Sequence, residues 1–211
     1  MIPNKQKWMK VLEERHGKEL QNKISSATVA ICGLGGLGSN IAIMLARAGV
    51  GRLILIDFDK VDISNLHRQQ YKPCQIGMNK TEALVYNLKE IAPYLETEAH
   101  TVRMDESNYF EFLQSADIIC EAFDNAEEKA KLVNFVLSEM STKYIVAASG
   151  MAGLGSSNSI KTRKVSTHFY LCGDEKSDVE DGIGLVASRV SVCASHQANM
   201  LLRIISGNFE E

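Results

Sequence analysis

Short apolar runs alternate with longer amphipathic segments along most of the chain. The apolar runs predict strands at 28–32, 52–56, 117–122 and 144–148, with a weaker strand at 96–102. Between them, apolar residues recur at the helical period and predict helices at 39–48, 79–91, 107–114 and 125–140. Strands that alternate with helices form parallel pairs joined by right-handed crossovers. The pattern therefore predicts an open, mostly parallel α/β sheet with helices on both faces.

The two ends of the chain depart from this alternation. Residues 5–24 place apolar side chains at helical spacing among charges, which predicts one amphipathic helix. After Gly150 we expect short strands at 160–162 and 165–171, a mobile acidic loop at 173–184 and a final helix at 186–205. We treat residues 1–211 as a single domain, with a core at about 27–150 and a C-terminal part at about 151–211.

Composition and charge exclude several classes of protein. The chain has 211 residues, of which 45% are hydrophobic and 23% charged, as in ordinary globular proteins. Its net charge of -3 lacks the basic excess of a phosphate-backbone binder, so we expect no nucleic-acid partner. There is no apolar signal-peptide core and no run long enough to span a membrane. We therefore expect a cytoplasmic protein without a membrane partner.

The five cysteines are irregularly spaced at positions 32, 74, 120, 172 and 193. They form no Cys-x-x-Cys pair, so neither a zinc tetrad nor a disulfide framework is expected. Cys32 and Cys120 lie inside apolar runs, which favours buried thiols.

A glycine-rich loop follows the first core strand and opens the next helix. Its glycines are Gly33, Gly35, Gly36 and Gly38. Glycine permits the tight turn and lets a ligand approach the backbone, while the helix start offers free N–H groups to an anion. Asp57 ends the second strand, where a carboxylate can accept ribose hydroxyls. Together these features predict an adenosine nucleotide; the alternative is a glycine-rich packing turn.

The polar loop at 57–69 favours ATP over a dinucleotide. It carries Asn65 and Arg68, and Lys80 begins the next helix. A guanidinium and an ammonium at one mouth suit a triphosphate, although a solvated charged loop is the alternative.

Asp124 and Asn125 follow the strand at 117–122. A carboxylate at this edge of the sheet can hold Mg²⁺. The alternative for Asp124 is a helix N-cap.

Taken in order, these segments closely resemble the ThiF/MoeB/HesA family, the bacterial relatives of ubiquitin-activating enzymes. The segments are Gly-Leu-Gly-Gly-Leu-Gly-Ser, Ile-Asp-Phe-Asp, Ser-Asn-Leu-His-Arg-Gln, Lys80 and Asp124-Asn125. The resemblance covers about residues 11–150 strongly and the rest weakly. It implies a Rossmann-like fold that binds Mg-ATP and adenylates the C-terminal glycine of a small ubiquitin-like sulfur carrier.

The resemblance also implies residue roles. Gly36 would lie against the nucleotide, Asp57 would take the ribose, Asn65, Arg68 and Lys80 would hold the phosphates, and Asp124, with Asn125 beside it, would bind Mg²⁺. Family members form homodimers in which an arginine from the partner's N-terminal helix reaches the far phosphates. Arg15 matches it best, with Lys18 or neither as alternatives.

The chain also departs from many relatives. It lacks their zinc-binding Cys-x-x-Cys pairs, so we expect no zinc. The 173–184 loop contains no cysteine, which leaves open whether Cys172 at its edge or Cys193 in the last helix has a covalent role. The short zinc-free form resembles the ThiF subgroup of thiamine biosynthesis, whose carrier is ThiS.

The expected reaction is attack of a carboxylate on the α-phosphate of ATP, giving an acyl-adenylate and pyrophosphate. Arg68, Lys80, Arg15 and Mg²⁺ would act by positioning and electrostatics, without a general base. Small residues at 149–157 and 182–187 are candidates to line a groove for the carrier's tail, with Arg189 facing it. The alternatives are another carboxylate, such as a MoaD-type carrier or other acid, and an NAD-dependent oxidoreductase.

Overall fold

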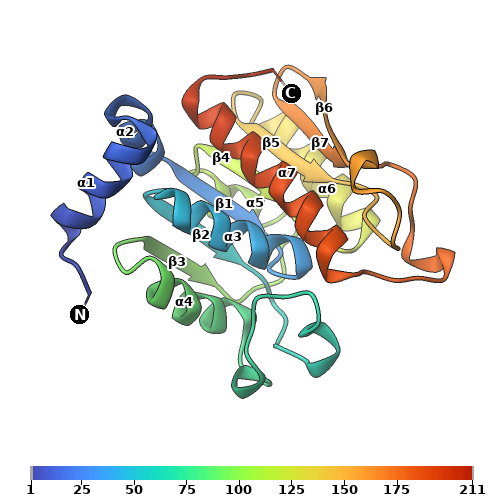
Figure 1. Ribbon diagram of the computed structural model, residues 1–211. Helices are drawn as coiled ribbons and strands as arrows, with labels where there is room; N and C mark the ends of the chain where they lie inside the picture. The colour runs from blue at the N-terminus through green and yellow to red at the C-terminus, as the bar shows by residue number, and fades with distance from the viewer. Residues whose placement is uncertain (1, 211) are drawn as a thin grey trace.

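The computed structural model describes residues 2–210, and within them seven strands form one open sheet in the order β3-β2-β1-β4-β5-β7-β6 (Figure 1). The strands are β1 (Thr28–Cys32), β2 (Arg52–Ile56), β3 (Glu96–His100), β4 (Ile118–Glu121), β5 (Tyr144–Ala148), β6 (Lys161–Ser166) and β7 (Phe169–Gly173). Neighbouring strands are parallel except β6, which pairs antiparallel with β7. The predicted mostly parallel α/β sheet is confirmed.

Helices cover both faces of this sheet, as Figure 1 shows. One face carries α3 (Gly36–Ala48), α4 (Lys80–Ile91) and α7 (Ala187–Ser206), and the other carries α5 (Tyr109–Leu113) and α6 (Ala126–Glu139). Alternate residues of one strand serve opposite faces: Ile31 belongs to the first hydrophobic core, whereas Cys32 belongs to the second. Burial on both sides explains why the central strands are continuous apolar runs in the sequence.

The N-terminal segment differs from its prediction. It forms two helices, α1 (Lys5–His16) and α2 (Lys18–Ser26), instead of one continuous helix. Gly17 separates them with φ 86°, a conformation that ends the helical hydrogen-bond pattern. All twelve residues of α1 are described, and none of them is buried.

The C-terminal part continues the sheet. The two predicted short strands are present, but the turn between them lies at residues 167–168, beyond the boundary that the sequence suggested. The stretch after β7 is irregular apart from a short 3-10 turn at Val179–Asp181. The final helix ends, as predicted, at Gly207, which adopts the left-handed conformation.

The sequence predicted buried thiols at Cys32 and Cys120 and no apolar run long enough to span a membrane. Cys32 and Cys120 are buried as expected, and so are Cys172 and Cys193, whereas Cys74 is exposed. Of the helices in residues 2–210, none combines the length and hydrophobicity that crossing a membrane requires.

Candidate active site

A cavity of about 310 Å³ lies at the carboxyl ends of β1, β2 and β4. Eight residues singled out in the sequence line it: Gly33, Gly35, Gly36, Asp57, Asn65, Arg68, Lys80 and Asp124. Ligands bind open α/β sheets at this edge, where the crossovers turn to opposite faces. The topology therefore brings residues from four separate segments to one mouth.

Asp57 is a fixed hydrogen-bond acceptor at the end of β2. Its carboxylate accepts the N–H of Leu34 at 2.6 Å and the N–H of Asp59 at 2.7 Å, and the residue is 8% exposed. Burial raises the pKa of the Asp57 carboxyl, although the nearby Lys80 and the two N–H groups oppose the rise. The side chain is thus tied to the glycine loop and oriented beside it.

Lys80 lies between two carboxylates at the start of α4. Its ammonium is 2.7 Å from the Asp59 carboxylate and 3.9 Å from that of Asp57, and its side chain is 6% exposed. Asp59 was not singled out in the sequence, although it stands in the same loop. An ammonium has three donors, so the contact with Asp59 leaves capacity for an anionic ligand.

Arg68 and Asp124 face the same cavity from different segments. Burial lowers the pKa of the Arg68 guanidinium, and the Asp124 carboxylate partly offsets this effect, so the two charges are electrostatically coupled. One Arg68 nitrogen donates to the Ser64 carbonyl at 3.3 Å, while its buried Nε has no partner among the described residues. The site therefore pairs a partly desolvated cation with an exposed carboxylate.

The backbone that carries Asp124 is held from below by a buried carboxylate. Glu121, the last residue of β4, is 0% exposed and accepts the Phe123 N–H at 2.6 Å. Both of its oxygens lie 2.9 Å from the ammonium of Lys129 on α6. This pair fixes the turn from β4 to α6, and hence the position of Asp124.

The glycines of the loop divide into two kinds. A Cβ on Gly33, which has φ 93°, would lie 2.7 Å from the Ala122 carbonyl, and a Cβ on Gly38 would lie 1.9 Å from the Gly33 carbonyl. These two positions pack the loop and helix against the sheet, and Gly38 is outside the described lining of the cavity. Gly35 and Gly36 meet only side-chain atoms and line the cavity.

Three other residues singled out in the sequence lie outside the described lining of the cavity. Asn125 caps α6 by accepting the Glu128 N–H at 3.0 Å. Arg15 is exposed at the end of α1. Arg189, expected to face a groove, is instead 4% exposed and donates to backbone carbonyls, because the preceding loops fold back over it.

Gln69 is a lining residue that the sequence interpretation did not single out. The residue is 7% exposed, and its Oε1 is buried without a hydrogen-bond partner among the described residues. An unpartnered buried acceptor costs free energy unless a ligand or water satisfies it. Its position beside Arg68, in the same polar run, was the available signal.

The cysteines near the C-terminal strands are poor nucleophiles in this conformation. Burial raises the pKa of Cys172 to about 11 and that of Cys193 to about 12. Both groups are therefore protonated near neutral pH. Because the thiolate is the reactive form, they are unreactive in this state. Among residues 2–210 no group of three or more His, Cys, Asp or Glu side chains is placed to hold a metal ion.

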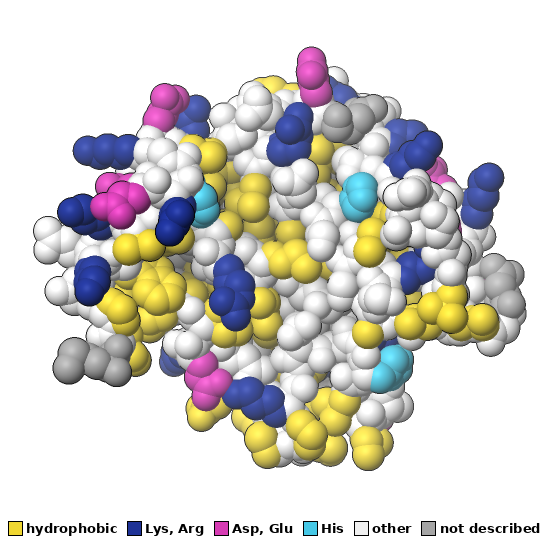
Figure 2. Space-filling view, in the orientation of Figure 1, with side chains coloured by type: hydrophobic (Ala, Val, Ile, Leu, Met, Phe, Trp, Pro, Cys, Tyr) yellow, Lys and Arg dark blue, Asp and Glu magenta, His cyan; other side chains and the backbone are white. Residues whose placement is uncertain are grey.

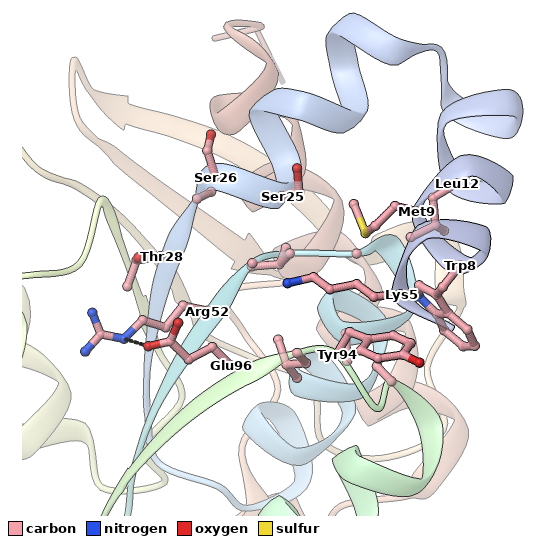
Figure 3. Close-up of a pocket in the computed structure, with 17 residues that line it drawn as sticks. Lys5, Trp8, Met9, Leu12, Ser25, Ser26, Thr28, Arg52, Tyr94 and Glu96 are labelled. Atoms are coloured by element: carbon pink, nitrogen blue, oxygen red, sulfur yellow. Dashed lines mark ion pairs between the residues drawn. The ribbon is translucent and has the colours of Figure 1, made fainter. Parts of the chain in front are cut away.

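A larger cavity, about 520 Å³, lies at the opposite edge of the sheet under α1 (Figure 3). Trp8 and Tyr94 pack edge-on at one end of it with ring centroids 6.3 Å apart, and Arg52 pairs with Glu96 at the other end. The residues singled out for catalysis or binding lie elsewhere. Size alone therefore does not select the candidate active site; the convergence of charged groups on the smaller cavity selects it.

Comparisons with known proteins agree with the family resemblance that the sequence motifs indicated. The model of the ThiF family matches residues 9–211. The adenylyltransferase and sulfurtransferase MOCS3 of Caenorhabditis briggsae is 38% identical over 116 residues, 54% of this chain and 29% of that protein. The adenylyltransferase and sulfurtransferase UBA4 of Lodderomyces elongisporus is 29% identical over 196 residues, 90% of this chain and 42% of that protein. The chain thus spans less than half the length of these relatives.

Solved structures extend the likeness to the whole fold. The E. coli tRNA N6-threonylcarbamoyladenosine dehydratase TcdA, solved in complex with ATP, superposes with a TM-score of 0.86 at 18% identity and covers 98% of both chains. At that identity the likeness concerns the fold. The family model, by contrast, matches nearly the whole sequence, and the chain belongs to the ThiF family.

Proposed function

We propose that this protein binds Mg-ATP in the cavity at the carboxyl edge and adenylates the C-terminal carboxylate of a small ubiquitin-like sulfur carrier of the ThiS type. The observation that carries the proposal is the convergence of Arg68, Lys80, Asp57 and Asp124 on one cavity. The names of the relatives MOCS3 and UBA4, both adenylyltransferases, support it.

The nucleotide would lie across the glycine loop with its ribose on Asp57. That carboxylate is already oriented by two N–H groups, so it can accept ribose hydroxyls without rearrangement. Gly35 and Gly36 leave room for the backbone to approach the phosphates. The unpartnered groups of Gln69 and Arg68 supply further contacts.

Asp124 fits a magnesium ion of the kind that accompanies ATP. It is an exposed carboxylate beside Arg68, and Mg²⁺ commonly binds one or two carboxylates together with substrate phosphates. When bound, the ion would neutralise charge on the phosphates. Asp124 is the residue that would hold it.

The reaction joins a carboxylate oxygen of the carrier to the α-phosphorus of ATP. The bond from that phosphorus to the oxygen bridging to the β-phosphate breaks, and pyrophosphate leaves. A carboxylate needs no base to attack, so the task of the protein is to bring two anions together. Arg68 and Lys80 reduce the repulsion between these two anions and stabilise the charge that develops on the phosphates.

Arg15 enters the proposal through a homodimer. It lies at the end of α1, a helix without a buried residue among its described positions, and Val11 on this helix is 48% exposed. Figure 2 shows apolar side chains gathered around α1, among lysines and arginines. A second copy packed on this helix would cover them and bring Arg15 towards the neighbouring active site.

A second candidate substrate is another carboxylate, such as a MoaD-type carrier. The likeness to TcdA, whose name refers to a tRNA, extends the choice to RNA-borne acids, but the net charge of -3 gives little support for an RNA partner. Membership of the ThiF family makes an NAD-dependent oxidoreductase the weakest alternative.

Carrier-dependent exchange of labelled pyrophosphate into ATP tests the proposal. A ThiS-type carrier ending in Gly-Gly should support exchange, whereas the same carrier without its last two residues should not. Exchange that is absent with ThiS-type carriers but present with a MoaD-type carrier would select the second candidate. Binding of NAD in preference to Mg-ATP would reject both.

A further inference from the structure

Arg189 uses all of its hydrogen-bonding capacity inside the protein. A guanidinium has five N–H donors. They reach the carbonyls of Ala152, Gly155 and Ser156, the hydroxyl of Ser159 and the carboxylate of Asp174. Four of these partners belong to the segment after β5 and the fifth follows β7. One side chain on α7 therefore ties two loops together.

Asp174 completes the connection from the other side. Its partial burial would raise its pKa, but backbone N–H groups of Ser177 and Lys176, the Ser177 hydroxyl and Arg189 outweigh this and hold the pKa at about 2. The Asp174 carboxylate is therefore ionised near neutral pH and serves as the counterion of Arg189. A Cβ on Gly150 would lie 2.2 Å from the same carboxylate, so the loops are in close contact.

The tied loops form one wall of the candidate active site. We define the C-terminal wall as residues 151–156 and 183–186. The Gly153 N–H donates to the Gly184 carbonyl at 3.0 Å and joins its two halves. Met151 and Leu185 line the cavity. The Leu185 carbonyl also lies 3.1 Å from the ring of His67, next to Arg68.

The chemistry of this wall differs from that of the opposite side. The charged residues Asp57, Arg68, Lys80 and Asp124 lie on the segments that follow β2 and β4, which we call the β1–β4 side. The C-terminal wall and α7 instead present Met151, Leu185 and Val190 to the cavity. Uncharged side chains on a hydrogen-bonded backbone suit an extended peptide better than a phosphate. A glycine tail that approaches the α-phosphate must come from the side that the triphosphate does not fill.

We propose that Arg189 is a positioning residue that, with Asp174, holds the C-terminal wall in the shape that binds the peptide tail of the carboxylate substrate. This inference rests on the proposed function, since it assigns the acceptor side of that same site. Loss of the connection should weaken binding of the tail and leave the nucleotide side intact.

Three variants and one control test this role. Arg189→Lys keeps the charge but loses the fork that reaches several carbonyls. Ser159→Ala removes one bond from an exposed serine and so preserves the fold. Asp174→Asn removes the counterion. The control is Glu175→Gln. Glu175 directly follows Asp174, but its side chain pairs with the exposed Arg163 on β6 instead of the C-terminal wall, so this variant weakens only that pair.

The first readout is the steady-state split between the two substrates. For a ThiS-type carrier ending in Gly-Gly, we expect KM to rise about tenfold in Arg189→Lys and Asp174→Asn and about two- to threefold in Ser159→Ala. The KM for ATP should stay within about twofold, and Glu175→Gln should resemble the wild type. A carrier KM that does not change, or an equal rise in both KM values, overturns the proposal.

The second readout is hydrogen exchange of the free protein, which needs no carrier. The Gly153 amide should exchange faster in Arg189→Lys, whereas the Leu34 amide, bonded to Asp57, should keep its protection. Unchanged exchange at Gly153 overturns the inference. A wild type that gives no carrier-dependent signal, with Gly153 exchange altered in the variant, instead rejects the proposed function and leaves the connection itself established.

Discussion

The two sides of the candidate active site use charged residues in opposite ways. On the β1–β4 side, Arg68 has a buried nitrogen without a partner among the described residues, and Asp124 is exposed beside it. On the C-terminal side, Arg189 is 4% exposed and its donors all have partners in the protein. A cation with unused capacity can bind a ligand, whereas a fully bonded cation organises the backbone around it.

This difference gives its largest effect when a charge on the β1–β4 side is removed. Asp124→Ala or Arg68→Ala should lower the rate of adenylation about 10²- to 10³-fold, as expected for preorganised charge stabilisation. Pyrophosphate exchange measures the loss. The matched control for Asp124 is Glu127→Ala, an exposed carboxylate on α6 paired with Lys131, which should keep wild-type activity.

Loss of the Glu121–Lys129 pair, which holds the turn that carries Asp124, should first lower the stability of the protein. Glu121→Gln breaks the buried pair with Lys129, whose side chain is 21% exposed, and should lower the free energy of unfolding by about 2–4 kcal/mol. Urea denaturation at pH 7 measures the change. Lys131→Gln, which breaks the exposed pairs with Glu127 and Glu128 on the same helix, should lower stability much less, because solvent screens exposed pairs. Equal losses of stability in the two variants would show that the buried Glu121–Lys129 pair contributes no more than an exposed pair.

The pH dependence of nucleotide binding should report Asp57. Because burial raises its pKa, protonation should begin above the ordinary aspartate value of about 3.9 as the pH falls. The protonated group loses acceptor capacity, so affinity for adenosine should fall on acidification. Adenosine has no phosphate to titrate, and calorimetry with Asp57→Asn provides the comparison. The same pH profile in both proteins would exclude Asp57 as the ribose acceptor.

The smallest predicted effect concerns the break between α1 and α2. Gly17 has φ 86°, so Gly17→Ala should lower the free energy of unfolding by about 1 kcal/mol through backbone strain. A Cβ there would meet no atom within 4 Å among the described residues, so steric clash is not the cause. Thermal unfolding measures it. A gain in stability would mean that the two helices readily join into one.

The sequence predicted which residues of the β1–β4 side meet at one cavity, because its signals are local. A strand, a glycine turn and Asp57 follow each other within one crossover, and burial on both faces makes β1 and β2 visible as apolar runs. Asp124 could be placed since the ends of parallel strands share an edge. The packing role of Gly38 could not be distinguished from ligand binding, because both require the absence of a Cβ.

The C-terminal side was predicted less well because its contacts are non-local. Arg189 reads as a surface arginine on a helix until two loops, 30 or more residues and 15 residues away along the chain, fold back onto it. Composition and spacing do not encode contacts between segments so far apart along the chain.

At the other end of the chain, the break at Gly17 was missed because one glycine is compatible with a helical pattern.

Intact-mass spectrometry of a Gly-Gly-ended ThiS-type carrier, incubated with ATP and this protein, tests the central claim most directly. Wild-type protein should add one AMP to the carrier, and Asp124→Ala, folded and at the same concentration, should leave it almost unmodified. An AMP adduct formed equally by both proteins would contradict the claim that the cavity holding Asp57, Arg68, Lys80 and Asp124 is where the chemistry occurs.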